Sequence, residues 1–288
     1  MTRDPLIGFA GLGNLGHAMS LNLIDKGWAL KVLDRRSERV KLLTDSGAEE
    51  VGPSGLADAD VICFAVPDAA AIRAILADGL IERLTPRHTI LVHSTILPDH
   101  ARELAARIEG ENGARYLDVP VSGGAERARR GKLTLLIGGE IQDITIAKPV
   151  LDDLGTSSFH LGPVGAGSAT KLANQLIMFA ALAGVHEALQ ITRAAGVGDM
   201  AALEAIETGT GDTWVGRNWG FFDRVVADYN SAGVAVTDRP WSKDLSELVS
   251  AGRDAGLSLP VAELLVHTLA DVVEIHAKAG TESKGKER

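Results

Sequence analysis

The sequence predicts an α/β domain with a doubly wound parallel sheet, followed by an all-α part that one long helix joins to it. Three observations predict this arrangement. Short, strongly apolar runs alternate with amphipathic stretches through the first half, which is typical of strands covered by helices on both faces. The glycine-rich segment 162–167 breaks this alternation. Beyond it, long stretches of Ala, Leu, Ile and Met show no strand-like pattern.

The elements follow from these patterns in order. Strands are expected at residues 6–10, 30–33, 61–66, 89–92, 116–119 and 133–137, and the first two connections are expected to hold helices at 14–26 and 37–46. A helix of unusual length is expected over 168–195, with Ser168 as its N-cap and Gly196 as its end. Shorter helices are expected at 200–208, 219–228, 243–255 and 261–279. These elements divide the chain into domains of residues 1–163 and 164–288.

Composition limits the classes of function. The 288 residues are 45% hydrophobic and 23% charged, which is enough apolar material for a sizeable core. There are 29 Lys and Arg against 38 Asp and Glu, and the net charge of −9 disfavours a nucleic-acid partner. The single cysteine, Cys63, excludes an intrachain disulfide and a cysteine metal cage. The eight histidines show no metal-ligand spacing, so no metal is expected.

The expected location is cytoplasmic. No apolar run reaches the roughly 18–20 residues that a membrane span needs. The first residues, Met1 to Pro5, lead directly into an apolar run and lack the core of a signal peptide. We therefore expect a soluble protein with no membrane partner.

A glycine-rich motif joins the first strand to the first helix. Gly11-Leu12-Gly13-Asn14-Leu15-Gly16 has the pattern G-x-G-x-x-G in the strand–turn–helix setting that makes this pattern informative. The first glycine permits a tight turn, the second lets backbone amides approach a pyrophosphate, and the third allows the helix to pack closely on the strand. The helix N-terminus adds N–H groups and partial positive charge. A turn that binds nothing can hold the same glycines, but this setting favours a bound dinucleotide.

Two opposing signals bear on which nicotinamide dinucleotide is bound. Asp34 ends the second strand, 18 positions after Gly16, where an acidic side chain holds ribose hydroxyls and repels a 2′-phosphate. Arg35, Arg36 and Arg39 follow, and guanidinium groups are natural phosphate ligands. The carboxylate favours NAD as the cofactor, and the arginines leave NADP open.

Two segments together resemble a known family. The runs Ile7-Gly8-Phe9-Ala10-Gly11-Leu12-Gly13-Asn14-Leu15-Gly16 and Asp118-Val119-Pro120-Val121-Ser122-Gly123-Gly124 are similar to signatures of the β-hydroxyacid dehydrogenases, which include 3-hydroxyisobutyrate dehydrogenase and tartronate semialdehyde reductase. The resemblance extends from about residue 6 to about residue 275, with four signature segments in order. It implies a Rossmann-type nucleotide-binding domain, a helical domain for substrate and oligomerisation, and hydride transfer between a nicotinamide cofactor and a small β-hydroxycarboxylic acid.

The resemblance assigns the binding of the substrate carboxylate to Ser122, Gly123 and Gly124. Two glycines after a strand expose backbone amides, and Ser122 adds a hydroxyl, which is a set suited to an anion. Arg127 stands where the family usually has glycine, and the arginines of this segment are best explained as a solvated helix face. A contact between one of them and a second anionic group on the substrate is the alternative.

The run Gly165-Ala166-Gly167-Ser168-Ala169-Thr170-Lys171-Leu172-Ala173-Asn174-Gln175 resembles the family's catalytic stretch, which makes Lys171 the general acid/base. Asn174 and Gln175 follow three and four residues later, hence on the same helix face, and are expected to orient the substrate. The family usually has a second Asn where this chain has Gln175, whose amide reaches one methylene further. A lysine on a helix is more often a surface residue, but the apolar helix and the glycine loop before it favour the catalytic interpretation.

Three further segments complete the expected site. The resemblance places Val66 and Pro67 along the middle of the cofactor, Thr95 near its nicotinamide end, and Lys243 where a C-terminal lysine reaches back to the cofactor. A charge pair at a helix N-terminus is the alternative for Lys243. His93, where the family usually has serine, is interpreted as a strand-end residue rather than a catalytic one.

The sequence as a whole predicts an NAD(P)-dependent 3-hydroxyacid dehydrogenase that forms a homodimer or homotetramer and binds its small carboxylate substrate in the cleft between its domains. Three alternatives stay open. An imine reductase on the same scaffold usually has another residue at the position of Lys171. An oxidative decarboxylase of a phosphorylated sugar acid needs a larger helical region. A non-catalytic dinucleotide-binding sensor does not need the lysine and the substrate loop that this chain retains.

Overall fold

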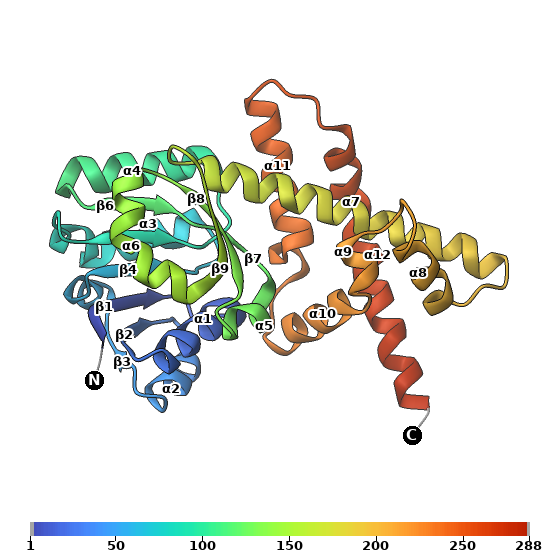
Figure 1. Cartoon of the computed structure of the whole chain (residues 1–288), viewed down its shortest axis with the longest axis horizontal. Coiled ribbons are helices and arrows are strands. Elements are labelled where there is room, and N and C mark those ends of the chain that lie inside the picture. Colours follow the sequence, from blue (N-terminus) through green and yellow to red (C-terminus); the bar gives the residue numbers. More distant parts are fainter. Residues whose placement is uncertain (1–2, 287–288) are drawn as a thin grey trace. The chain divides into compact units, whose positions relative to one another are not determined.

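The computed structural model describes the backbone of residues 3–286 and the side chains of residues 5–278. The chain folds as two compact units, Met1–Lys171 and Leu172–Arg288 (Figure 1). They part inside helix α7 (Ala166–Ala194), whereas the boundary expected at 163/164 lies in the loop before this helix. The first residues of α7 belong to the first unit because they bind the end of a strand there, as shown below.

The first unit is built on one sheet, which has nine strands within residues 3–286. They are β1 (Arg3–Ala10), β2 (Trp28–Leu33), β3 (Glu49–Glu50), β4 (Val61–Phe64), β5 (Thr89–Val92), β6 (Arg115–Asp118), β7 (Val121–Ser122), β8 (Leu133–Gly138) and β9 (Gly155–Gly162). Their order is β3-β2-β1-β4-β5-β6-β8-β7, with β9 also paired to β8. All neighbours from β3 to β6 are parallel, which confirms the doubly wound sheet.

The far end of the sheet contains antiparallel pairs, which the expectation of a parallel sheet does not include. Strand β8 runs antiparallel to both β6 and β7, and β9 is a strand that the sequence analysis does not predict. The sequence of β9, Gly-Thr-Ser-Ser-Phe-His-Leu-Gly, is polar and mostly exposed because this strand pairs only with β8. An edge strand with one partner needs no continuous apolar run, so the sequence holds no signal for it.

Helices cover both faces of this sheet. Within β4, Val61 and Cys63 join one buried cluster and Ile62 and Phe64 join the other, which is the alternation of side chains along a strand. The first cluster includes residues of α1 (Asn14–Asp25), α2 (Ser37–Thr44), α5 (Gly124–Arg129) and α6 (Ile141–Leu154). The second includes residues of α3 (Ala69–Ile75) and α4 (Pro98–Asn112).

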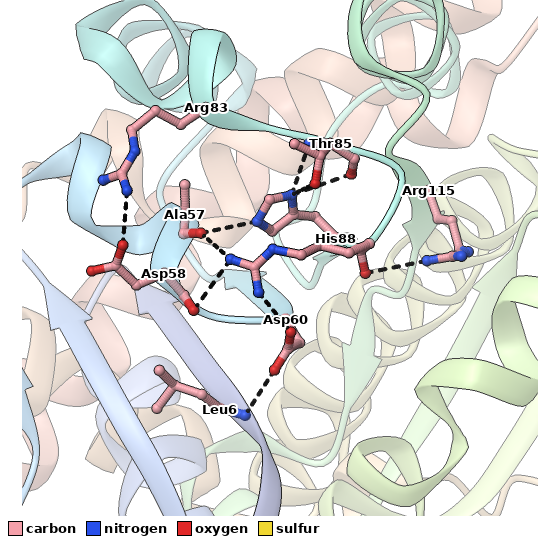
Figure 2. Close-up of polar contacts among 9 residues, drawn as sticks. Leu6, Ala57, Asp58, Asp60, Arg83, Thr85, His88 and Arg115 are labelled. Atoms are coloured by element: carbon pink, nitrogen blue, oxygen red, sulfur yellow. Dashed lines mark hydrogen bonds and ion pairs between the residues drawn. The ribbon is translucent and has the colours of Figure 1, made fainter.

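A polar network ties together the amino ends of the parallel strands (Figure 2). The buried ring of His88, just before β5, donates from Nε2 to the carbonyl of Ala57 at 2.9 Å. Arg87 donates to Asp60 at 2.9 Å, and Asp60 accepts the N–H of Leu6 in β1 at 3.3 Å. This edge of the sheet is thus closed by its own side chains, and the opposite edge carries the loops predicted to bind ligands.

Among its described residues the second unit consists of helices joined by turns and contains no strand, as expected. Beside α7 it contains α8 (Asp199–Glu207), α9 (Trp214–Arg217), α10 (Phe221–Ser231), the short turn η4 (Val236–Asp238), α11 (Pro240–Asp254) and α12 (Pro260–Lys286). Helix α7 begins at Ala166, so the expectation that Ser168 is its N-cap is wrong. Gly196 follows its end with φ +80°, a conformation that glycine adopts without strain.

Helix α7 is long and apolar enough to cross a membrane, by length and composition alone. The sequence expectation did not allow for this. Core helices of folded units pass the same test, and Phe179, Leu182 and Leu189 of α7 are buried against protein. Packing in its own unit therefore accounts for part of the apolar character of α7, while Ile177 and Ile191 of the same helix are exposed.

Candidate functional site

The loops that follow the parallel strands leave the sheet at one edge, here called the carboxyl edge. β1 is followed by the glycine loop, β2 by Asp34, β4 by Val66 and β5 by Thr95. The strand order runs outward in opposite directions from β1 and β4, so the direction of the connections reverses between these two strands. Ligands of doubly wound sheets bind at this reversal. The fold thus gathers the cofactor residues predicted in the first unit at the edge where such a ligand binds.

The three glycines of the loop differ in what surrounds them. Gly11 has φ +94°, and a side chain there would overlap the carbonyl of Ala65, while one at Gly16 would overlap the carbonyl of Gly11. A Cβ atom at Gly13 would meet only Arg39 Nη1, at 3.7 Å. The first and third glycines therefore serve internal packing, and the second borders open space. This is the cradle that a pyrophosphate needs, so the residues present fit a dinucleotide.

Asp34 is built into the glycine loop. Its Oδ2 accepts the N–H of Leu12 at 2.7 Å, and its Oδ1 accepts the N–H of Arg36 at 2.9 Å. Arg39 Nη1 lies 3.8 Å from Oδ2, whereas the side chain of Arg35 is exposed. The carboxylate is thus fixed beside the loop by two backbone amides, and one of the three predicted phosphate ligands already pairs with it.

The loops after β4 and β5 are joined to each other. The N–H of Val66 donates to Ser94 Oγ at 3.0 Å, which holds the Val66–Pro67 segment beside the segment that contains Thr95. His93 lies at the end of β5, where its buried ring donates from Nδ1 to the carbonyl of Val119 at 2.9 Å. Burial lowers the pKa of His93 to about 4, so the ring is neutral at pH 7.

The predicted substrate loop has a backbone that only glycine adopts readily. Ser122 ends β7, and the two residues after it, Gly123 and Gly124, have φ of +136° and +71°. Two consecutive positive φ angles explain why two glycines stand here. Arg127, on the helix that follows, is exposed and donates from Nε to the carbonyl of Lys132 at 2.8 Å. It therefore lies on the helix surface and folds back on its own turn.

The helix that carries Lys171 is held by a residue to which the sequence analysis assigns no role. Asp118, at the end of β6, is fully buried, and its carboxylate accepts the N–H groups of Gly165 at 2.9 Å and Ser168 at 2.7 Å. The backbone that enters α7 is thereby attached to the strand end at the carboxyl edge. Asp118 lies in the motif quoted for the resemblance, and an acidic residue that ends an apolar strand is the signal that could have singled it out.

The remaining predicted residues belong to the second unit. Gln175 of α7 is buried, and its Nε2 donates to Asp244 Oδ2 of α11 at 2.8 Å. Lys243 Nζ lies 3.4 Å from Asp244 Oδ1 and 3.2 Å from Glu247 Oε1. Asp244, which the sequence analysis does not single out, therefore joins two predicted residues. The additional methylene of Gln175 lets its amide reach α11, so one of its N–H groups is used within the protein.

The described part of the chain shows neither a metal site nor a reactive cysteine. Among the described side chains, those of residues 5–278, no three His, Cys, Asp or Glu gather as metal ligands. Cys63 is fully buried in β4, and burial raises the pKa of its thiol far above the usual range, so it stays protonated. The glycine loop and Asp34 at the carboxyl edge are suited to binding a dinucleotide.

Comparison with known proteins agrees with this geometry. Residues 6–162 match a family model described as the NAD binding domain of 6-phosphogluconate dehydrogenase, and residues 165–284 match one described as NAD-binding of NADP-dependent 3-hydroxyisobutyrate dehydrogenase. The 3-hydroxyisobutyrate dehydrogenase of Pseudomonas aeruginosa is 29% identical over 287 residues, which cover 97% of this chain and 94% of the relative. The NAD-dependent L-serine dehydrogenase of that organism is 31% identical over 266 residues, which cover 90% and 89%.

Solved structures show the same likeness. Mycobacterium tuberculosis 3-hydroxyisobutyrate dehydrogenase with L-serine has a TM-score of 0.81 at 26% identity, with 96% of each chain covered. A variant imine reductase from Myxococcus stipitatus in complex with NAD⁺ has a TM-score of 0.66 at 20% identity, with 96% of this chain and 95% of that chain covered, and it shares the fold. With both units matched in order, the chain belongs to the β-hydroxyacid dehydrogenase family of NAD(P)-dependent oxidoreductases.

Proposed function

We propose that this hydroxyacid dehydrogenase oxidises a small carboxylic acid that bears a hydroxyl group on its β-carbon, with Lys171 as the general acid/base. The relatives are named for 3-hydroxyisobutyrate and L-serine, and both molecules combine a carboxylate with a β-hydroxyl group. The observation that carries the proposal is the place of Lys171. It lies in the second turn of α7, whose first turn is bound to the end of β6 at the carboxyl edge.

Each residue of the proposed site has its own role in the reaction. A bound nicotinamide ring supplies the hydride acceptor for oxidation and the hydride donor for reduction. Lys171, as a neutral amine, accepts the proton of the substrate hydroxyl during oxidation, and as an ammonium group it returns a proton to that oxygen during reduction. Ser122 and the two glycines after it hold the carboxylate through a hydroxyl and backbone amides. Asn174 shares the helix face of Lys171 and orients the substrate.

Gln175 has a different role in this proposal. Its Nε2 group is bound to Asp244, which also lies beside the ammonium group of Lys243. We assign Gln175 to holding α11 against α7, and leave the contact with substrate to Asn174. This division follows from the length of the glutamine side chain, which spans the two helices.

NAD is the proposed preferred cofactor. The carboxylate of Asp34 is fixed by two backbone N–H groups beside the glycine loop, where a 2′-phosphate would meet its negative charge. The guanidinium group of Arg39 lies 3.8 Å from this carboxylate and pairs with it.

Self-association is also proposed. Several large apolar side chains of the second unit are exposed, which is typical of surfaces that bind protein. Ile177 and Ile191 of α7 are 72% and 73% exposed, and Leu264 and Ile275 of α12 are 63% and 65% exposed. Each pair falls on one face of its helix, since 14 and 11 residues are close to whole numbers of turns. Light scattering that gave a monomer mass at micromolar concentration would contradict the dimer or tetramer.

A panel of β-hydroxyacids, assayed with NAD and NADP by absorbance of the reduced cofactor, tests the activity. Lys171→Ala is expected to lose turnover by about a hundredfold or more while it still binds the nucleotide, because it removes the proton acceptor. Lys148→Ala is the matched control, since Lys148 is exposed and pairs with Asp152 on the surface of α6. Wild-type turnover in the Lys171→Ala variant would refute the assignment, and absence of turnover across the panel would refute the substrate class.

A further inference from the structure

Asp118 connects two parts of the proposed site that are distant in sequence. Its residue ends β6, and the chain continues through Val119 and Pro120 to the substrate loop at Ser122. Its carboxylate accepts the N–H groups of Gly165 and Ser168, which are 47 and 50 residues away. One buried side chain thus links the strand before the substrate loop to the start of the lysine helix.

The carboxylate of Asp118 provides hydrogen-bond acceptors at the start of α7. The first amides of an α-helix have no partner within it and carry partial positive charge. A side-chain oxygen usually accepts from them, but the residue before α7 is Gly165, which has no side chain. Asp118 supplies both oxygens from another element, and its negative charge complements the helix N-terminus.

The Asp118 side chain is closely packed on two sides. A side chain at Gly138 in β8 would overlap Asp118 Oδ1. A Cβ atom at Gly167, the second residue of α7, would lie 2.9 Å from the Asp118 carbonyl and 3.0 Å from its Oδ2, and would overlap the carbonyl of Leu136. Two glycines therefore make room for the carboxylate and for the close approach of the helix.

We propose that Asp118 is a positioning residue for hydride transfer, whose carboxylate fixes the first turn of α7, and thereby Lys171, relative to the strand that leads to the substrate loop. The inference rests on the proposed role of Lys171, which stands three residues after Ser168. Asp118 acts through the helix and needs no contact with substrate or cofactor.

The test replaces Asp118 by asparagine. The amide keeps the shape but removes the charge, and its NH₂ group faces one of the two backbone donors. Asp60→Asn is the matched control, since Asp60 also accepts a backbone N–H group, that of Leu6, but lies at the amino ends of the strands (Figure 2). Both variants are assayed for kcat, for NADH affinity by fluorescence, for the thermal midpoint, and for hydrogen exchange of the amides in residues 165–171.

Asp118→Asn is expected to lower kcat by about tenfold to a hundredfold, because a small displacement of a catalytic group has that effect. Its NADH affinity should stay within about twofold, and the Ser168 amide should exchange about tenfold faster or more. Asp60→Asn is expected to lower the thermal midpoint and to keep kcat and the exchange at Ser168. A merely structural role of Asp118 would lower the thermal midpoint in the same way as Asp60→Asn and leave kcat of the folded protein unchanged.

Failure of this inference is distinguishable from failure of the proposed function. A folded Asp118→Asn variant with wild-type kcat, beside an inactive Lys171→Ala variant, would overturn the positioning role alone. Wild-type turnover in Lys171→Ala would overturn both. If Asp118→Asn does not fold, exchange in the wild-type protein decides: a Ser168 amide protected as well as the helix interior supports the link, and a rapidly exchanging one overturns it.

Discussion

Replacement of Gly13 by alanine separates nucleotide binding from folding. Gly13 has φ −66° and ψ −174°, which alanine adopts without strain, and its Cβ atom would meet only Arg39 Nη1 at 3.7 Å. The loss of backbone freedom in the unfolded chain favours the variant by about 0.4–1 kcal/mol. Gly13 is also the N-cap of α1, where alanine is disfavoured by a similar amount, so the free energy of unfolding should change by less than about 1 kcal/mol. The same methyl group would occupy the space into which a pyrophosphate approaches the loop amides. Loss of one charge-assisted hydrogen bond costs about 1.5–3 kcal/mol, which corresponds to a Kd raised about tenfold to a hundredfold.

Gly16→Ala serves as the contrasting variant. Its methyl group would overlap the carbonyl of Gly11 and lie 3.2 Å from the Cβ of Ala65, so the helix must move away from the strand. Overpacking of this kind costs about 1–3 kcal/mol of the free energy of unfolding. Urea unfolding measures the stability of both variants, and fluorescence titration with NADH measures their affinity. A Gly13→Ala variant that is as stable as the wild type and binds NADH with unchanged Kd would refute the assignment of the open side of this loop to the pyrophosphate.

Two further predictions concern Asp34 and His93. Asp34→Ser should lower kcat/KM with NAD and raise kcat/KM with NADP, so that the ratio of the two values changes by about tenfold or more. The reason is that the charge that repels a 2′-phosphate is removed while Arg35, Arg36 and Arg39 remain. An unchanged ratio in steady-state assays would contradict this prediction. Burial lowers the pKa of His93 to about 4 in the folded protein, against 6.5 in the unfolded chain. Between these two pH values the unfolded chain therefore binds one more proton than the folded protein. The contribution of His93 to the free energy of unfolding is thus constant above pH 6.5 and decreases as the pH falls towards 4. The full pKa shift corresponds to about 3 kcal/mol of unfolding free energy. The loss of unfolding free energy between pH 7 and pH 4.5 should therefore be smaller in His93→Leu than in the wild type. Equal losses in the two proteins would show that His93 is not the cause.

Much of the first unit follows from local signals. The six expected strands are all present, because each is a short apolar run, and in strands such as β4 and β5 alternate side chains face two buried clusters. The glycine motif and Asp34 also stand where their spacing places them, at the ends of β1 and β2. In these cases the residues that specify the structure are close together in sequence.

Tertiary structure alone decided the rest. The antiparallel direction of β8 and the existence of β9 depend on pairing between strands, and the polar edge strand has no periodic signal of its own. The link from Asp118 to Ser168 and the link from Gln175 to Asp244 join residues 50 and 69 positions apart. A side chain's partner at such a distance depends on which elements pack together, and a buried polar group accepts whatever donor the packing brings to it. Residue types and spacing therefore determined the nucleotide-binding fold, and the family resemblance singled out Lys171. The tertiary structure decided how its helix is held, because the two buried carboxylates that bind this helix, Asp118 and Asp244, come from distant parts of the chain.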